Sequence, residues 1–370
     1  LITKGTTPKS FVNSGVTFVK IEGLFGIKIL KDKCLFISKS THENELKRSQ
    51  LREDDILFAI AGTIGKFGLV QKDILPANTN QALAIIRLKD NRHVEFLLQV
   101  LGTKLMLKYI YQNISVGAQP NLNLQQIGNF QYLSPSLPEQ QKIASFLSTV
   151  DRKIQALNKK KELLESYKKG VMQQIFKQEI RFRKEDGSDY PEWEEKRLGE
   201  VAIVTMGQSP SSTSYNNENL GIPLIQGNAD IIKRKTKPRQ YTTEPTKKIA
   251  QGELIMTVRA PSGYIAKSYH NACIGRGVCS IGKSKGNLNF LYYYLLWFEP
   301  RWVQFEQGST FTAISGNDIR NLVIKAPKDN EEKTNIGRFL TSIDNKINTV
   351  LSQIDKTKEW KKGLLQQMFV

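Results

Sequence analysis

The stretch KKGVMQQIF at residues 168–176 returns as KKGLLQQMF at residues 361–369, with six of the nine positions identical. The two stretches are 193 positions apart. At the same spacing IASFLSTVDRKI (143–154) lies over IGRFLTSIDNKI (336–347), without a gap up to the nonamers. Such self-similarity at a fixed spacing is typical of a duplicated structural segment.

The match continues upstream with a slowly drifting spacing, as insertions in loops produce. DDILFAIAGTIG (54–65) matches GELIMTVRAPSG (252–263) at a spacing of 198, and LITKGTTP (1–8) matches IVTMGQSP (203–210) at 202. The whole chain is therefore one segment of about 190 residues written twice. We refer to the two as the first and the second copy.

Each copy ends in a helical part whose apolar residues recur at alternating three- and four-residue steps. This is the narrow seam of a coiled coil and not the wide stripe of a helix on a globule. Forty-one residues in a helix from 138 to 178 would span about 60 Å. The predicted seam residues are Ile143, Leu147, Val150, Ile154 and Leu157 in the first helix and Ile336, Leu340, Ile343, Ile347, Val350 and Ile354 in the second.

Two helices of equal period, each leaving a similar domain, pack most simply on each other. We expect them to be antiparallel and related by a pseudo-twofold axis, because the first must run to the second domain and the second must return. The alternative is that each helix caps its own domain. Gly170 and Gly363 each cost about 1 kcal/mol in a helix interior, so we expect a close crossing or a partner-subunit contact there, or else a helix end.

The other part of each copy predicts an α+β domain with a curved, largely antiparallel sheet. Short β-rich segments such as DILFAIAG and ELIMTVRA are followed at matching positions by helical stretches at 94–110 and 290–306. The division is a domain at 1–137, a helix at 138–178, a second domain with its linker and lead-in at 179–326, and a helix at 327–370.

The second copy has a lead-in, YPEWEEKRLGEVA (190–202), that the first lacks. We expect about 15 residues resembling it to precede Leu1 in the natural protein.

The formal net charge is +19, and the four segments carry +7, +5, +5 and +2 in chain order. An excess of cations spread along the whole chain suits a long polyanion such as double-stranded DNA. No apolar run approaches the roughly 20 residues of a membrane helix, and three cysteines are too few for a disulfide framework. We expect a cytoplasmic protein with no membrane partner.

Catalytic and metal-binding patterns are weak. GTIGKF (62–67) lacks the glycine spacing of a phosphate loop, and PEWEEK (191–196) is only a faint echo of a nuclease core. His270, Cys273 and Cys279 do not have the spacing of a zinc site. The chain is expected to be non-catalytic, with no metal and no cofactor of its own.

Polar loops carry side chains suited to DNA. KRKTKPR (233–239) has five basic residues in seven, which suits phosphates, although a solvated loop is the plain alternative. Gln226 and Asn228 can make paired contacts to adenine edges. Arg259 falls opposite Ala61 of the first copy, and Arg276 opposite Gln81, as two readers of different sequences would show. The full set of expected DNA-binding residues is Lys4, Thr6, Thr7, Lys66, Asn80, Gln81, Gln119, Asn121, Gln208, Ser209, Gln226, Asn228, Lys233, Arg234, Lys235, Lys237, Arg239, Arg259, Arg276, Thr310 and Thr312.

With these residues in view, the chain resembles the specificity (S) subunits of type I restriction-modification systems. The resemblance covers essentially the whole chain. It is carried by SLPEQQKIASFLSTVDRKI (136–154), the terminal KKGLLQQMF, WEEKRLGEVA, and the turns Gly5–Pro8 and Gly207–Pro210.

The resemblance implies two target-recognition domains, each reading one half of a split DNA site, joined by an antiparallel coiled coil that acts as a ruler. It implies a bacterial or archaeal cytoplasmic complex with two methyltransferase (M) subunits and with restriction (R) subunits. S-adenosylmethionine, ATP and Mg belong to those partners. A free-standing DNA-binding regulator, an unrecognised nuclease and a coiled-coil scaffold without nucleic acid remain the alternatives.

Overall fold

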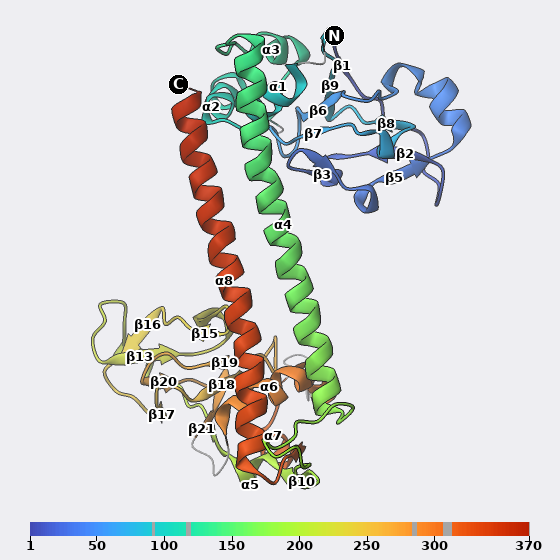
Figure 1. Ribbon diagram of the computed structural model, residues 1–370. Helices are drawn as coiled ribbons and strands as arrows, with labels where there is room; N and C mark the ends of the chain where they lie inside the picture. Colours follow the sequence, from blue (N-terminus) through green and yellow to red (C-terminus); the bar gives the residue numbers. More distant parts are fainter. Residues whose placement is uncertain (91–92, 116–119, 283–286, 306–312, 370) are drawn as a thin grey trace. The chain divides into compact units, whose positions relative to one another are not determined.

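The computed structural model describes residues 1–90, 93–115, 120–282, 287–305 and 313–369. It consists of two compact units (Figure 1). Unit 1 comprises Leu1–Asn158 with Ser352–Val370, and unit 2 comprises Lys159–Leu351. The boundaries fall within two long helices, α4 (Leu137–Phe176) and α8 (Asn330–Met368). Each unit therefore holds one α+β domain, one stretch of α4 and one stretch of α8.

The domain of unit 1 carries two main sheets and three helices. One sheet has the order β1-β9-β6-β7 and the other β5-β2-β8, beside a β3-β4 ribbon. The strands are β1 (Ile2–Lys4), β2 (Val16–Val19), β3 (Leu24–Phe25), β4 (Lys28–Ile29), β5 (Leu35–Ile37), β6 (Ile56–Ala59), β7 (Phe67–Leu69), β8 (Ala77–Thr79) and β9 (Leu83–Ile86). The helices are α1 (Val94–Leu101), α2 (Lys104–Asn113) and α3 (Leu124–Gly128).

The domain of unit 2 repeats this arrangement with additional strands. Its main sheets have the orders β11-β21-β18-β19-β15-β14 and β12-β16-β13-β20-β17. The strands are β11 (Ile203–Met206), β12 (Tyr215–Asn216), β13 (Ile222–Ile225), β14 (Ile231–Ile232), β15 (Lys235–Thr236), β16 (Gln240–Thr242), β17 (Lys248–Ile249), β18 (Leu254–Thr257), β19 (Ile265–Lys267), β20 (Ala272–Ile274) and β21 (Val278–Gly282). A further ribbon pairs β10 (Glu194–Arg197) with β22 (Val323–Ala326), and the helices are α5 (Leu198–Val201), α6 (Leu288–Phe298), the 3-10 helix η9 (Glu299–Phe305) and α7 (Gly316–Asn321).

Matching strands occupy matching places in the two units. The order β1-β9-β6-β7 of unit 1 is that of β11-β21-β18-β19 in unit 2, and β5-β2-β8 corresponds to β16-β13-β20. The parallel pair β2–β8 likewise corresponds to the parallel pair β13–β20. The α+β prediction is confirmed, but the expectation of one curved sheet per domain is wrong. The strands of each domain are divided between two main sheets.

Packing explains why these segments become central strands. All four residues of β6 and all four of β18 are buried, as expected for strands covered on both faces. Each unit also has a short helix that begins with a capping box. The pair is Asn123 with Gln126 in α3 and Ser315 with Asp318 in α7. These pairs satisfy the free backbone N–H groups at the helix start.

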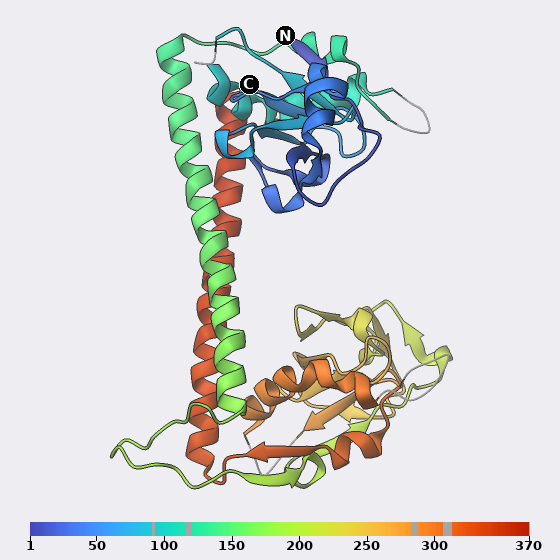
Figure 2. The ribbon, with the colours of Figure 1, turned by 90° about the vertical axis from the view of Figure 1, so that its right-hand side faces the viewer.

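The long helices α4 and α8 pack together within each unit, and they lie side by side in both ribbon views (Figure 2). In unit 1 Nζ of Lys361 donates to both carboxylate oxygens of Asp151, at 2.7 and 2.8 Å. In unit 2 Nζ of Lys168 donates to Asp344 at 2.6 Å. Asp344 stands 193 positions after Asp151, and Lys361 stands 193 after Lys168. The same ion pair is therefore made twice, and its pairing of early with late helix positions means that the helices are antiparallel.

The eleven predicted seam residues are buried or half-buried in these helices. Six of them are less than a tenth exposed in the second helix: Ile336, Leu340, Ile343, Ile347, Val350 and Ile354. In the first helix Leu147 and Val150 are buried, while Ile143, Ile154 and Leu157 are partly exposed.

The last residue of each opening nonamer docks on the domain of its unit. Phe176, which is 3% exposed, has its ring centroid 5.9 Å from that of Phe290 in α6. Phe369 has its centroid 5.5 Å from that of Phe96 in α1. The end of α4 thus packs on the second domain, and the end of α8 on the first. The alternative that each helix caps only its own domain is wrong.

The glycines of the nonamers have a different environment from the one expected. A Cβ atom added to Gly170 or to Gly363 would meet no atom within 4 Å, so no close helix crossing within the chain requires them. Both helices also continue beyond these positions, which rules out a helix end. A contact with a partner subunit stays a prediction.

The two units differ at the strand ribbon of the second. Residues 130–133 of unit 1 are the equivalent of β22, but they do not form a strand. Leu133 is 79% exposed. In unit 2 the partner strand of β22 is β10, which belongs to the lead-in at 190–202.

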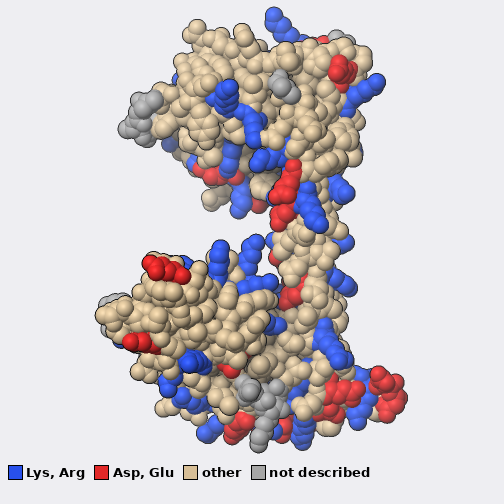
Figure 3. All heavy atoms as spheres, turned by 90° about the vertical axis from the view of Figure 1, so that its left-hand side faces the viewer, with Lys and Arg blue, Asp and Glu red and all other residues tan. Residues whose placement is uncertain are grey.

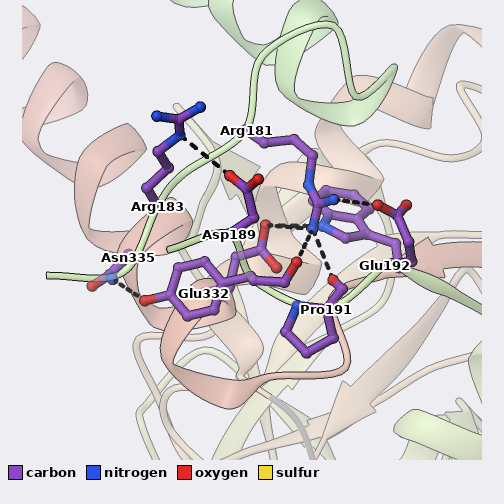
Figure 4. Close-up of polar contacts among 9 residues, drawn as sticks. Arg181, Arg183, Asp189, Pro191, Glu192, Glu332 and Asn335 are labelled. Carbon is purple, nitrogen blue, oxygen red and sulfur yellow. Dashed lines mark hydrogen bonds and ion pairs between the residues drawn. The ribbon is translucent and has the colours of Figure 1, made fainter. Parts of the chain in front are cut away.

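The segment between α4 and β10 is fixed to the start of α8 by Arg181 (Figure 4). Its guanidinium donates to Glu192 at 2.7 Å and to the carbonyl oxygens of Tyr190 and Pro191, and it lies 3.8 Å from the buried carboxylate of Glu332. Trp193 Nε1 donates to the same carboxylate at 3.0 Å. Burial is the main cause that raises the pKa of Glu332.

Among the residues described, no helix has the length and apolar character needed to cross a bilayer.

Candidate nucleic-acid interface

Equivalent turns in the two domains are held by the same backbone hydrogen bonds. In unit 1 Gly5 N donates to Leu83 O at 3.2 Å and Thr6 N to Thr79 O at 2.9 Å. In unit 2 Gly207 N donates to Val278 O at 3.0 Å and Gln208 N to Ile274 O at 2.9 Å.

Glycine is required at both turns. A Cβ atom at Gly5 would collide with the carbonyl oxygens of Thr79 and Asn80, and one at Gly207 with that of Gly275. The two G-x-[TS]-P turns therefore press the chain against the turn between two strands, β8 and β9 in unit 1 and β20 and β21 in unit 2.

In unit 2 this close approach forms a polar hollow of about 230 Å³. Its lining brings together five of the predicted DNA-binding residues: Ser209, Gln226, Asn228, Arg259 and Arg276. The small residues Gly227, Ala260 and Gly277 complete the lining. These residues come from four separate places in the sequence, the turns after β11, β13, β18 and β20. The backbone N–H of Arg276 donates to Ser209 Oγ at 3.2 Å.

The loop that carries Gln226 and Asn228 is fixed by Asp230. This aspartate is buried, accepts from Gln226 N at 2.8 Å and accepts from Arg239 Nε at 2.8 Å. Arg239 therefore positions the loop through Asp230. This role of Asp230 was not predicted, although Asp230 is the only acidic residue of the QGNAD stretch and a strongly basic stretch follows it.

The glycines at the floor of the hollow were missed as well. A Cβ atom at Gly277 would collide with Gln226 O, and one at Gly275 would lie 3.3 Å from Gln226 Cα. A pair of glycines around an arginine, GRG, is the sequence signal that could have indicated a close approach of two loops.

The equivalent place in unit 1 carries different side chains on the same frame. Thr7 Oγ1 donates to Gln81 Oε1, where unit 2 has Ser209 and Arg276. Asn80 Oδ1 is buried without a hydrogen-bond partner among the described residues. Ala61 forms a β-bridge with Asn121, and Arg259 forms the equivalent bridge with Ala313.

The basic loop 233–239 divides into paired and exposed cations. Arg234 donates to Glu299 at 2.7 and 3.2 Å, and its guanidinium lies 4.3 Å from the ring centroid of Tyr264. Hydrogen bonding to Glu299 and its charge raise the pKa of Arg234 against the opposing effect of burial. Lys233, Lys235 and Lys237 are exposed.

Two further predicted residues belong to unit 1. Lys4 is exposed on β1 and Lys66 is exposed before β7. Gln119, Thr310 and Thr312 lie outside the described residues. On the face drawn in Figure 3, lysine and arginine side chains occur on both units and along the helices.

Comparisons with known proteins agree with this arrangement. The family model described as "Type I restriction modification DNA specificity domain" matches residues 2–166 and again residues 190–359. The chain belongs to this family. Its two matched regions correspond to the two copies of the internal repeat. The chain is a DNA specificity subunit of a type I restriction-modification system, and subunits of this family are non-catalytic.

Relatives of the specificity family cover most of the chain. It is 29% identical over 360 residues to a putative type I restriction enzyme MjaX specificity subunit of Methanocaldococcus jannaschii, covering 92% of this chain and 84% of that protein. A chain from a structure that describes complex assembly and conformational transition of a type I R-M system has a TM-score of 0.62 at 23% identity, with 99% and 96% coverage. The S subunit from M. genitalium gives 0.60 at 15% identity, with 100% and 93% coverage. At these identities the solved structures support the fold.

Family membership sets aside the nuclease alternative. The PEWEEK stretch that suggested it lies at β10, where Glu194 forms an ion pair with Lys196 at 2.6 Å. In the described ranges, no three His, Cys, Asp or Glu side chains come together as a metal site would need.

Proposed function

We propose that each α+β domain of this specificity subunit reads one half of a bipartite, asymmetric DNA site, and that the α4–α8 coiled coil sets the unread spacer. One observation carries the proposal. The two domains place different polar side chains on turns with the same backbone hydrogen bonds, at Thr7 and Gln81 in one and at Ser209 and Arg276 in the other. One frame with two sets of readers suits two different half-sites.

The proposed division follows the repeat. Residues 1–137 and 179–326 form the two reading domains, and residues 138–178 and 327–370 form the helices between them. Exposed Lys233, Lys235 and Lys237 would contribute salt-dependent affinity through phosphate contacts.

The partners are inferred from the family. The chain would dock two methyltransferase subunits, which supply S-adenosylmethionine chemistry, and restriction subunits with ATP and Mg would join them. One chain with a similar fold comes from a structure that describes the assembly of a type I R-M complex. We place the complex in the cytoplasm of a bacterium or archaeon.

Methylome sequencing tests the proposal directly. Cells would express this chain with its cognate methyltransferase subunit, and a split, asymmetric methylated motif is expected. A single contiguous motif, or no motif that depends on this chain, would refute it. Tight operator binding by the purified chain alone would instead favour a free-standing regulator.

The spacer function has a separate test. Seven residues would be inserted into α4 between Asp151 and Lys168, and seven into α8 between Asp344 and Lys361, which keeps both ion pairs in register. One heptad adds about 10 Å of helix, the length of about 3 base pairs. We expect the spacer to grow by about that amount with both half-sites unchanged. Altered half-sites would contradict the ruler.

A further inference from the structure

Two arginines at the hollow of unit 2 differ from the other arginines of its loops. Arg234 is ion-paired with Glu299, and Arg239 with Asp230. Arg259 and Arg276 are exposed, and within the described ranges no acidic side chain pairs with either. The structure therefore uses Arg234 and Arg239 internally and leaves the guanidinium groups of Arg259 and Arg276 for a ligand.

The chemistry of the hollow limits what that ligand can be. A guanidinium group only donates hydrogen bonds, so both arginines require acceptors. Gln226 and Asn228 lie in the same lining, and their amides both donate and accept. On DNA, neighbouring acceptors that fit a guanidinium fork occur as phosphate oxygens and as the N7 and O6 atoms of guanine.

Comparison of the two copies separates these two sources. Phosphates are the same at every DNA sequence, so cations that grip them would be needed at the equivalent places in both domains. Unit 1 has Ala61 where unit 2 has Arg259, and Gln81 where unit 2 has Arg276, on turns with equivalent backbone hydrogen bonds. Side chains that differ on a common frame suit base edges, which differ between half-sites.

We propose that Arg259 and Arg276 read guanine, so that the half-site of unit 2 contains guanine at the positions these residues contact. Unit 1 has neither arginine and makes neither guanine contact. Its Gln81, at the place of Arg276, selects adenine by hydrogen bonds to the N6 and N7 atoms of that base. This assignment rests on the proposed function and specifies the bases that the two domains recognise.

Methylome sequencing of variants tests the assignment in the complex with the methyltransferase subunit. Arg276→Gln gives unit 2 the residue of unit 1, and should replace a required guanine by adenine, or relax it, in one half-site. Arg259→Ala should relax a second guanine in the same half-site. The other half-site should stay unchanged in both variants. Arg183→Ala, an exposed arginine paired with Asp189 away from the hollow, is the matched control and should leave the motif intact.

Binding measurements with modified DNA address the contact itself. Replacing the assigned guanine by 7-deazaguanine removes its N7 acceptor, and should weaken binding of the wild-type complex by about 5- to 150-fold. The Arg276→Gln complex should not discriminate between the two DNAs at that position.

The outcomes separate the two levels of the proposal. A bipartite motif without guanine in either half-site overturns the assignment, as does an intact motif with uniformly reduced methylation in the arginine variants, which would indicate phosphate contacts. If wild type gives no bipartite motif at all, the proposed function itself has failed.

Discussion

Removing the lysine that links α8 to α4 in unit 1 should destabilise that unit. Lys361 donates to both oxygens of Asp151, which also accepts from Gln99 Nε2 of α1 at 3.3 Å. Asp151 therefore joins three helices, α4, α8 and α1. Unit 2 repeats the junction, because Asp344 accepts from Lys168 at 2.6 Å and from the hydroxyl of Tyr293 in α6 at 2.7 Å.

The magnitude follows from the burial of the pair. Side-chain exposure is 20% for Lys361 and 19% for Asp151, so solvent screens this pair less than a surface ion pair. A hydrogen bond to a charged group contributes about 1.5–3 kcal/mol. We expect Lys361→Met to lower the free energy of unfolding of unit 1 by about 2 kcal/mol, which at the size of this unit lowers its Tm by roughly 4–8 °C.

Thermal unfolding combined with hydrogen exchange would measure this effect. Lost protection should be confined to residues 1–158 and 352–369 for Lys361→Met, and to 159–351 for Lys168→Met. The neighbouring Lys362→Met removes an exposed lysine from the same helix turn and serves as the control. Equal effects of Lys361→Met and Lys362→Met would refute the reasoning, as would a coupling energy below about 0.5 kcal/mol in the double-mutant cycle with Asp151→Asn.

Three further predictions concern single sites. Gly170→Ala and Gly363→Ala should each stabilise the chain by about 0.5–1 kcal/mol in denaturant unfolding, because their Cβ atoms meet nothing within 4 Å; destabilisation would mean that the local helix needs glycine. The folded-state pKa of Glu332 is raised by burial, so the folded chain holds its proton to higher pH and stability falls as pH rises through the interval from the unfolded to the folded pKa. Thermal unfolding midpoints of wild type should therefore fall relative to Glu332→Gln on raising the pH through this interval, and a constant difference would contradict this. Burial raises the pKa of Cys279 to about 12 and that of Cys34 to about 11, so mass spectrometry at pH 8 should find neither thiol alkylated by iodoacetamide until the chain unfolds; rapid labelling of the folded chain would contradict this.

The internal repeat allowed the fold to be predicted from the sequence, because repeated segments are expected to form equivalent structures in the two copies. The nonamers 168–176 and 361–369 predicted two antiparallel helices, and the structure gives a reason for their invariant letters. Their first lysine joins the aspartate of the other helix, and their last phenylalanine packs on the domain there. The glycine between them could not be interpreted from sequence, since its environment within the chain is open.

The site was less accessible to sequence reasoning, because charge alone does not say which cations are already paired. Arg234 and Arg239 stand in the densest basic stretch, yet both are held by carboxylates distant in the sequence or hidden in a turn. Arg259 and Arg276 stand in less basic surroundings and meet at one hollow. Only the pairing of strands brings them together, and strand order across two sheets is a long-range property.

The composition of the two units sets an order for folding on the ribosome. Unit 2 is continuous, from Lys159 to Leu351, and can assemble as soon as its last residues emerge. Unit 1 includes the stretch from Ser352 onward, which carries Lys361 and Phe369. Unit 1 therefore cannot complete its folding until this stretch has been synthesised. During translation the first domain therefore lacks the helix that covers Phe96 in α1, and a nascent chain stopped before residue 352 should leave this apolar face open to chaperones.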